Sequence, residues 1–236
     1  LLSRSLPTCS VIARTNPPAP TLLGSHIDFQ IAMGDIGQYL RPDLAAFKNG
    51  QPYLRADSGH VSKLRGQYRA LSGDRLKIGL SWRSGTEHAG TARSFDDASL
   101  ARLMKFQDVW WLSLQYGDIT DDMASLHAAN SNPPHVDAGI DPMQSMDDLA
   151  AQISRLDLVI SVANTTVHLA GALGIPTIAL LPHNADWRWM AEGEQCHWYP
   201  SVRLLRQTKA GDWTEILDKL ENELCNRVSE AAIKSY

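Results

Sequence analysis

The sequence has few cysteines, and none of them belongs to a recognisable pair. Cys9, Cys196 and Cys225 are its only three, and they are widely spaced. A disulfide framework needs an even set of cysteines at regular spacing, and a structural zinc site needs clustered cysteine or histidine pairs. The histidines show no metal-ligand spacing either. The sequence therefore favours a reducing compartment, which we expect to be the cytoplasm, and predicts no metal site.

Long apolar runs and an excess of positive charge are also lacking. A membrane-spanning helix needs about 20 consecutive apolar residues, and no run approaches that length. Residues 1–7 lack the basic-then-apolar order of a secretory signal peptide. The net charge of −4 argues against a general nucleic-acid surface. We therefore expect neither a transmembrane segment nor a nucleic-acid partner.

What the sequence does contain is a regular alternation of apolar strands and amphipathic helices, beginning at Leu76. This order is typical of an α/β fold with a doubly wound parallel sheet. Strands are predicted at 76–82, 109–114, 135–138, 156–162, 177–181 and 202–205, and helices at 97–106, 121–129, 145–155, 165–174 and 213–235.

Residues 1–75 are less regular. They predict two short strands, at 9–13 and 26–32, a helical turn at 36–40 and a helix at 62–71. These elements are too few for a complete α/β domain. We therefore divide the 236 residues into a partial amino-terminal lobe, residues 1–75, and a complete carboxyl-terminal domain, residues 76–236.

The corner between the strand at 156–162 and the next helix is the strongest candidate site. Asn164, Thr165, Thr166 and His168 occupy it. The corner follows a strand and opens a helix, and open α/β sheets bind ligands at such places. Unpaired N–H groups and the helix dipole favour an anion such as phosphate there. Asn and Thr also cap many helices that bind nothing, so capping alone remains an alternative.

Two neighbouring loops supply further candidates. Arg83 and Arg93 flank a polar, glycine-containing loop after the first strand, and guanidinium groups suit phosphate oxygens. Either arginine could instead be a solvated surface residue. Trp187 and Arg188 follow the strand at 177–181 and are predicted on the rim of the same crevice. We expect Trp189 and Trp198 to pack in the interior, because tryptophan is highly buried on average.

The motifs of this region resemble a known family. The runs at 157–162, 164–176 and 180–189, followed by Trp198-Tyr199-Pro200 and the run at 203–207, resemble the carboxyl half of bacterial glycosyltransferases with the GT-B fold. More narrowly, they are similar to the domain that follows tetratricopeptide repeats in proteins related to glycosyltransferase family 9, the lipopolysaccharide heptosyltransferases. The resemblance covers about residues 75–220 with several ordered motifs.

The resemblance implies a Rossmann-like domain that takes a nucleotide-sugar donor as substrate, with the donor phosphates at residues 164–168, and no cofactor or metal. It also implies a protein or cell-envelope saccharide as acceptor. The general base of the family lies near a glycine-rich loop that this sequence lacks, so no catalytic residue is assigned. The family usually has Asp where this chain has Ala163.

Three functions remain open. The leading expectation is a glycosyltransferase, or the donor-binding domain of one. The alternative is a non-catalytic module that holds a nucleotide sugar or a protein partner. A nucleotide-sugar epimerase is disfavoured, because its acid and base carboxylates are not found. A homo-oligomer, formed through the partial lobe, is also an expectation.

Overall fold

The computed structural model describes residues 1–24, 27–47, 50–85, 90, 93–129 and 132–234. Residues 86–89 and 91–92 of the predicted glycine-containing loop lie outside these ranges, as does His26 at the start of a predicted strand.

A parallel sheet of five strands forms the centre of the molecule, with the strand order β2-β1-β3-β4-β5. In such an order the switch point, where crossovers turn to opposite sides, lies between β1 and β3. Ligands of open sheets bind at the carboxyl ends of the strands beside this point. The strands are β1 (Leu76–Ser81), β2 (Val109–Ser113), β3 (Leu158–Val162), β4 (Thr177–Leu181) and β5 (Val202–Arg206).

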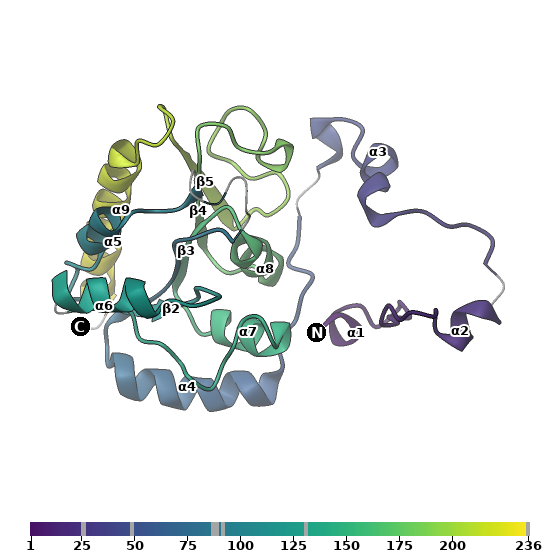
Figure 1. Ribbon diagram of the computed structural model, residues 1–236, viewed down its shortest axis with the longest axis horizontal. Coiled ribbons are helices and arrows are strands. Elements are labelled where there is room, and N and C mark those ends of the chain that lie inside the picture. Colours follow the sequence, from purple (N-terminus) through teal and green to yellow (C-terminus); the bar gives the residue numbers. More distant parts are fainter. Residues whose placement is uncertain (25–26, 48–49, 86–89, 91–92, 130–131, 235–236) are drawn as a thin grey trace.

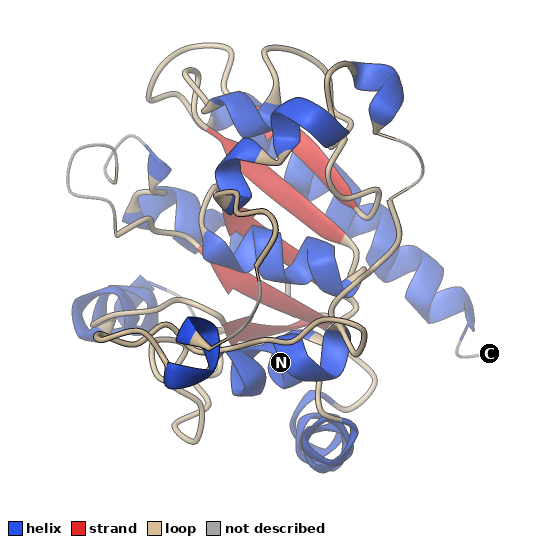
Figure 2. Cartoon of the chain, turned by 90° about the vertical axis from the view of Figure 1, so that its right-hand side faces the viewer, coloured by secondary structure: helices blue, strands red, loops and turns tan. Residues whose placement is uncertain are grey.

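Helices cover both faces of the sheet, as Figures 1 and 2 show. Neighbouring residues of β3 point to opposite faces of the sheet. Ile160 packs in the buried cluster on one face, and Val159 packs in the buried cluster on the other. This alternation confirms the predicted doubly wound α/β fold. One face carries α5 (Asp97–Leu103), α6 (Thr120–Ala129) and α9 (Thr214–Lys234), and the other carries α4 (Ser58–Ser72), α7 (Met146–Ile153) and α8 (Thr165–Leu173).

Local signals in the sequence fix both ends of α8. Asn164 accepts a hydrogen bond from the backbone N–H of Thr166 and thereby caps the amino end. Gly174 ends the helix with a φ of 76°, in the left-handed region that glycine adopts at little cost.

The predicted strand at 135–138 is wrong. His135 forms only an isolated parallel bridge with Leu112. Pro133 and Pro134 precede it, and proline cannot donate to a strand ladder, so the pairing does not extend.

The two strands predicted before residue 75 are also wrong. Residues 9–13 and 27–32 are exposed and form no strand. A strand needs a hydrogen-bonded neighbour, and the five-stranded sheet is built entirely from residue 76 onward. Figure 1 shows this segment lying to one side of the sheet and its helices. Its described residues form short helical turns: α1 (Leu2–Ser5), α2 (Pro20–Leu23), η1 (Met33–Asp35), α3 (Gly37–Leu40) and η2 (Leu44–Ala46).

Helix α4 packs against the sheet domain. Leu64 and Tyr68 belong to the same buried cluster as α7. The Tyr68 hydroxyl donates to Asp137 (2.8 Å) and accepts from Gln152 Nε2 (3.0 Å). The division of the chain at residue 75 remains a prediction. None of the described helices is both long and apolar enough to cross a membrane.

Candidate functional site

Asn164 stands at the switch point and joins the ends of two strands. Its Nδ2 donates to Ser81 Oγ (2.8 Å) and to the Arg83 carbonyl (3.1 Å). Its Oδ1 accepts from the Thr166 N–H (2.9 Å) and lies 3.0 Å from Ser161 Oγ. The buried side chain thus uses both polar atoms within the protein. Direct contact between Asn164 and a ligand stays a prediction, and it requires the exchange of one of these bonds.

The other corner residues differ in their access to solvent. Thr165 is exposed at the first position of α8. Thr166 is only 1% exposed, so its side chain faces the interior. His168 is half-buried and lines the large cavity described below. The corner therefore offers the exposed Thr165 and the ring of His168 to a ligand.

The two predicted counter-charges are placed differently. The Arg83 guanidinium forms an ion pair with Asp122 on α6 (2.9 Å) and donates to the Asp118 carbonyl (2.6 Å). Its use by a ligand at the corner would require this pairing to break. Arg93 is half-buried at the end of its loop, and its backbone N–H donates to Gly90. Neither arginine is among the described residues that line the cavity, and their predicted role is untested.

A cavity of about 830 Å³ lies between the irregular amino-terminal segment and the sheet domain. Such a volume falls within the range of small-molecule sites. Residues 33–47 form one wall. His168 in the first turn of α8 and the segment after β4 form the other. The lining includes Arg41, Phe47, His168, Trp187, Arg188, Met190, Trp198 and Tyr199.

The rim of this cavity is aromatic and carries two guanidinium groups. Asp43 also lines the cavity, and Arg188 pairs with Asp186 at 3.3 Å. The Arg188 guanidinium lies 4.9 Å from the ring centroid of Trp187, which is 66% exposed. Trp198 Nε1 donates to the Arg188 carbonyl (3.0 Å), and Phe47 packs edge-on against Trp198 at 4.7 Å. Across the cavity, the Arg41 guanidinium lies 5.6 Å from the Phe47 ring. Trp187 and Arg188 border this cavity, and their role at a ligand site stays a prediction.

His168 is fixed by two aromatic neighbours. Its ring stacks on Trp189 with centroids 5.0 Å apart and an interplanar angle of 20°. Its Nδ1 lies 3.2 Å from the Tyr199 hydroxyl. Burial lowers the pKa of His168, Arg188 lowers it further, and Asp186 acts in the opposite direction. The ring is therefore neutral near neutral pH.

The segment after β4 is held by Arg206 at the end of β5. Its guanidinium donates to the carbonyls of Trp189 and Gly193. Between them, Met190 adopts a φ of 59°. A non-glycine residue in this region is strained, and such strain persists only where surrounding contacts impose it. Trp189 is 2% exposed, as expected, whereas Trp198 is partly buried and also borders the cavity.

Sequence reasoning missed Arg41, Phe47 and Met190, and it did not assign Tyr199 to the site. Tyr199 lies in a stretch rich in aromatics and arginines, which did point to this region. Arg41 and Phe47 lie in a segment without periodic pattern, so no local signal marked them. They join the site only because residues 33–47 lie opposite His168 and the segment that follows β4.

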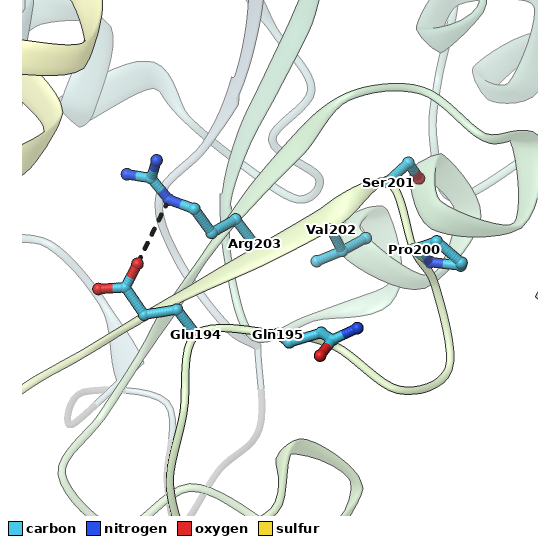
Figure 3. Close-up of a pocket in the computed structure, with 6 residues that line it drawn as sticks. All are labelled: Glu194, Gln195, Pro200, Ser201, Val202 and Arg203. Carbon is cyan, nitrogen blue, oxygen red and sulfur yellow. Dashed lines mark ion pairs between the residues drawn. The ribbon is translucent and has the colours of Figure 1, made fainter. Parts of the chain in front are cut away.

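A second, smaller cavity of about 360 Å³ lies at the start of β5, away from the carboxyl ends of the strands. Figure 3 shows Arg203 facing Glu194 there, with Arg203 Nε 3.8 Å from the carboxylate. Because the two charges compensate each other, this cavity has no strong preference for a charged ligand. Among the described residues, no group of three or more His, Cys, Asp or Glu is arranged to hold a metal ion.

The chain was compared with protein families, with curated proteins and with solved structures. No protein-family model matches the chain. Protein FlbA from Caulobacter vibrioides is 32% identical over 200 residues, which are 84% of this chain and 33% of that protein. The chain thus spans about a third of the length of this relative.

Two solved structures are similar. ADP-heptose LPS heptosyltransferase II from E. coli matches 77% of this chain and 57% of its own, with a TM-score of 0.54 and 17% identity. A family 9 glycosyltransferase from Veillonella parvula DSM 2008 matches 77% of this chain and 52% of its own, with a TM-score of 0.49 and 14% identity. The chain shares its parallel α/β fold with the heptosyltransferase.

Proposed function

We propose that this chain is a glycosyltransferase, or the donor-binding domain of one, and that its donor is a nucleotide-activated sugar. The observation that carries the proposal is the cavity between residues 33–47 and the segment after β4, with His168 on its wall. The cavity combines aromatic surface with two guanidinium groups, those of Arg41 and Arg188. A nucleoside diphosphate has the matching chemistry, because it joins a flat base to two adjacent negative charges.

The arrangement suits the chemistry of transfer. When the sugar leaves its nucleotide, negative charge develops on the diphosphate, and preorganised donors lower the barrier by stabilising that charge. Arg188, Arg41 and the first turn of α8 are groups of this kind. The proposed reaction uses no cofactor and no metal. The general base that takes the acceptor's proton is not assigned.

Several finer features of the proposal rest on the motif resemblance. The domain is proposed to be of the type that follows tetratricopeptide repeats, with a protein or a cell-envelope saccharide as acceptor. Residues 1–75 are proposed to be part of an amino-terminal lobe, and residues 76–236 the donor-binding domain. The proposed location is the cytoplasm, and association into a homo-oligomer is proposed as well.

A second function is favoured by one observation. Ala163, where the family usually has Asp, packs in an apolar cluster with Val167 and Trp189. A carboxylate at this corner could bond a donor hydroxyl or orient a backbone N–H, and a methyl group cannot. This supports a module that binds the nucleotide sugar without turning it over.

The proposal is tested by a thermal-shift and calorimetric screen of nucleoside mono- and diphosphates with different bases. A ligand at 100 times its dissociation constant adds about 2.7 kcal/mol to the stability of the fold. His168→Ala and Arg188→Ala are expected to weaken the response, because both side chains line the cavity. A panel without any stabilising nucleotide would contradict the proposal.

Hydrolysis or transfer of the donor by the full-length protein separates the two functions. A glycosyltransferase releases the nucleoside diphosphate from the bound donor over time. A binding module shows the same affinity and no release.

A further inference from the structure

The two ring nitrogens of His168 have different surroundings. Nδ1 lies 3.2 Å from the Tyr199 hydroxyl. Nε2 has no hydrogen-bond partner among the described residues, while the ring itself lines the cavity. One nitrogen is therefore bonded inside the protein, and the other remains for a ligand.

The geometry of this contact is tightly determined. Stacking on the buried Trp189 fixes the plane of the His168 ring. Gly171 lies one turn further along α8, and a Cβ added there would meet Tyr199 Cγ at 2.5 Å. Only glycine lets the tyrosine lie this close to the helix. The absence of a side chain at 171 is thus part of what brings the hydroxyl to Nδ1.

The direction of the hydrogen bond follows from the chemistry of the two groups. An unprotonated imidazole nitrogen is a stronger acceptor than a phenol oxygen. Burial raises the pKa of Tyr199, and Tyr53 raises it further, so the phenol keeps its proton. The charged groups near the neutral His168 are Arg188 and Asp186, and Arg41 and Asp43 lie on the facing wall of the cavity. The hydrogen bond at one ring nitrogen decides which nitrogen carries the proton.

We propose that Tyr199 is a positioning residue that holds His168 as the Nε2–H tautomer, so that the cavity presents a neutral N–H donor to an oxygen of an anionic ligand such as a diphosphate. Only the identity of that ligand rests on the proposed function. The positive charge that attracts the ligand comes from Arg41 and Arg188, while His168 contributes a directed hydrogen bond. The tautomer is a property of the unliganded protein and is measured without any ligand.

Long-range ¹H–¹⁵N NMR spectra of the full chain report the tautomer directly. The variants are Tyr199→Phe, which removes only the hydroxyl, and Tyr68→Phe as a matched control, which removes a hydroxyl that contacts Asp137 and Gln152 rather than His168. Tyr53 is unsuitable as a control, because it hydrogen-bonds to Tyr199. We expect Nε2–H alone in the wild type and in Tyr68→Phe, and a mixture of both tautomers in Tyr199→Phe. A proton on Nδ1 in the wild type, or an unchanged tautomer in Tyr199→Phe, overturns the inference.

Calorimetry with ADP, GDP, UDP and CDP adds a functional readout. We expect Tyr199→Phe to bind the preferred nucleotide about twofold more weakly than the wild type at about pH 8, because only the Nε2–H fraction of its tautomer mixture presents the donor. Once the pH has fallen below the depressed pKa of His168 the difference shrinks, because a protonated ring carries a proton on Nε2 in either protein. An equal weakening above and below that pKa contradicts the tautomer role.

The two proposals fail in different ways. If the spectra show the expected tautomers and none of the four nucleotides binds the wild type, the positioning role of Tyr199 stands and the proposed function falls. If a nucleotide binds and the tautomer is independent of Tyr199, the proposed function stands and the positioning role of Tyr199 falls. Gly171→Ala is a second variant, and it is expected to displace Tyr199 and to give the same mixture of tautomers.

Discussion

The side-chain amide of Asn164 donates to the Ser81 hydroxyl over 2.8 Å and thereby ties the end of β3 to the end of β1. Ser81 in turn donates to Gln115, whose Oε1 also accepts from the backbone N–H of Trp82 and of Arg83. The three strand ends at the switch point are thus joined by one buried polar network. This network holds the corner that opens α8, the helix whose first turn carries His168 on the cavity wall.

Asn164→Ala is expected to destabilise the fold by about 3 kcal/mol. The variant loses the cap of α8 and leaves buried partners on β1 without their donor. Ser145→Ala is the matched control, since Ser145 caps α7 by a single bond to Asp148, and it should cost about 1 kcal/mol. Urea unfolding followed by circular dichroism measures both. Equal costs for the two caps would show that the network adds nothing.

Trp187 and Trp189 give a second prediction, because they lie two residues apart and differ in burial. Trp189→Ala should lower the free energy of unfolding by about 3–5 kcal/mol, since Trp189 is 2% exposed. Trp187→Ala should leave stability almost unchanged and weaken nucleotide-sugar binding about fivefold, by the loss of a stacking surface. Chemical denaturation and calorimetry separate the two effects. A strongly destabilised Trp187→Ala protein would contradict its place on the rim.

Arg188→Gln and Arg41→Gln are each expected to weaken binding of a nucleoside diphosphate about tenfold, through the loss of a charge-assisted hydrogen bond. Arg69→Gln, on the exposed side of α4, removes the same charge away from the cavity and should have no effect. Calorimetry at two salt concentrations checks the result. Full affinity in both cavity variants would place the diphosphate elsewhere.

The pH dependence of stability gives a fourth prediction. The pKa of His168 in the folded protein lies below the value of 6.5 that it has when unfolded. Between these two values the unfolded state binds more protons than the folded state. The contribution of His168 to the free energy of unfolding is therefore fully present above about pH 6.5, and it is lost as the pH drops through this range. The measurement is urea unfolding at about pH 7.5 and about pH 5.5 for the wild type and for His168→Gln.

We expect the loss of stability on acidification to be smaller in His168→Gln than in the wild type. His127→Gln, on the exposed side of α6, is the control and should behave as the wild type does. If His168→Gln loses as much stability as the wild type, the folded-state pKa of this histidine is not depressed.

Local patterns in the sequence determined the elements of the sheet domain. The apolar run at 177–181 and its boundary are those of β4, and Asn164 and Gly174 mark the ends of α8 as their residue types indicate. Each of these features is set by residues close together in the sequence. They are the spacing of apolar residues, the capping side chain and the glycine that adopts a positive φ. The same reasoning placed Trp187 and Arg188 beside a crevice, because loops after parallel strands gather at one edge of the sheet.

The composition of the cavity was decided by the tertiary structure alone. Arg41 and Phe47 reach it from a segment with no periodic pattern, and Arg83 is paired with Asp122, a partner 39 positions further along the chain. Such contacts join residues that are far apart in the sequence. Their energies depend on the distance and burial of the two groups, and these are set by the folded chain rather than by the residue type and its sequence neighbours. For the same reason the sequence identified Asn164 as a cap, and only the folded chain showed that its amide group is already committed to Ser81.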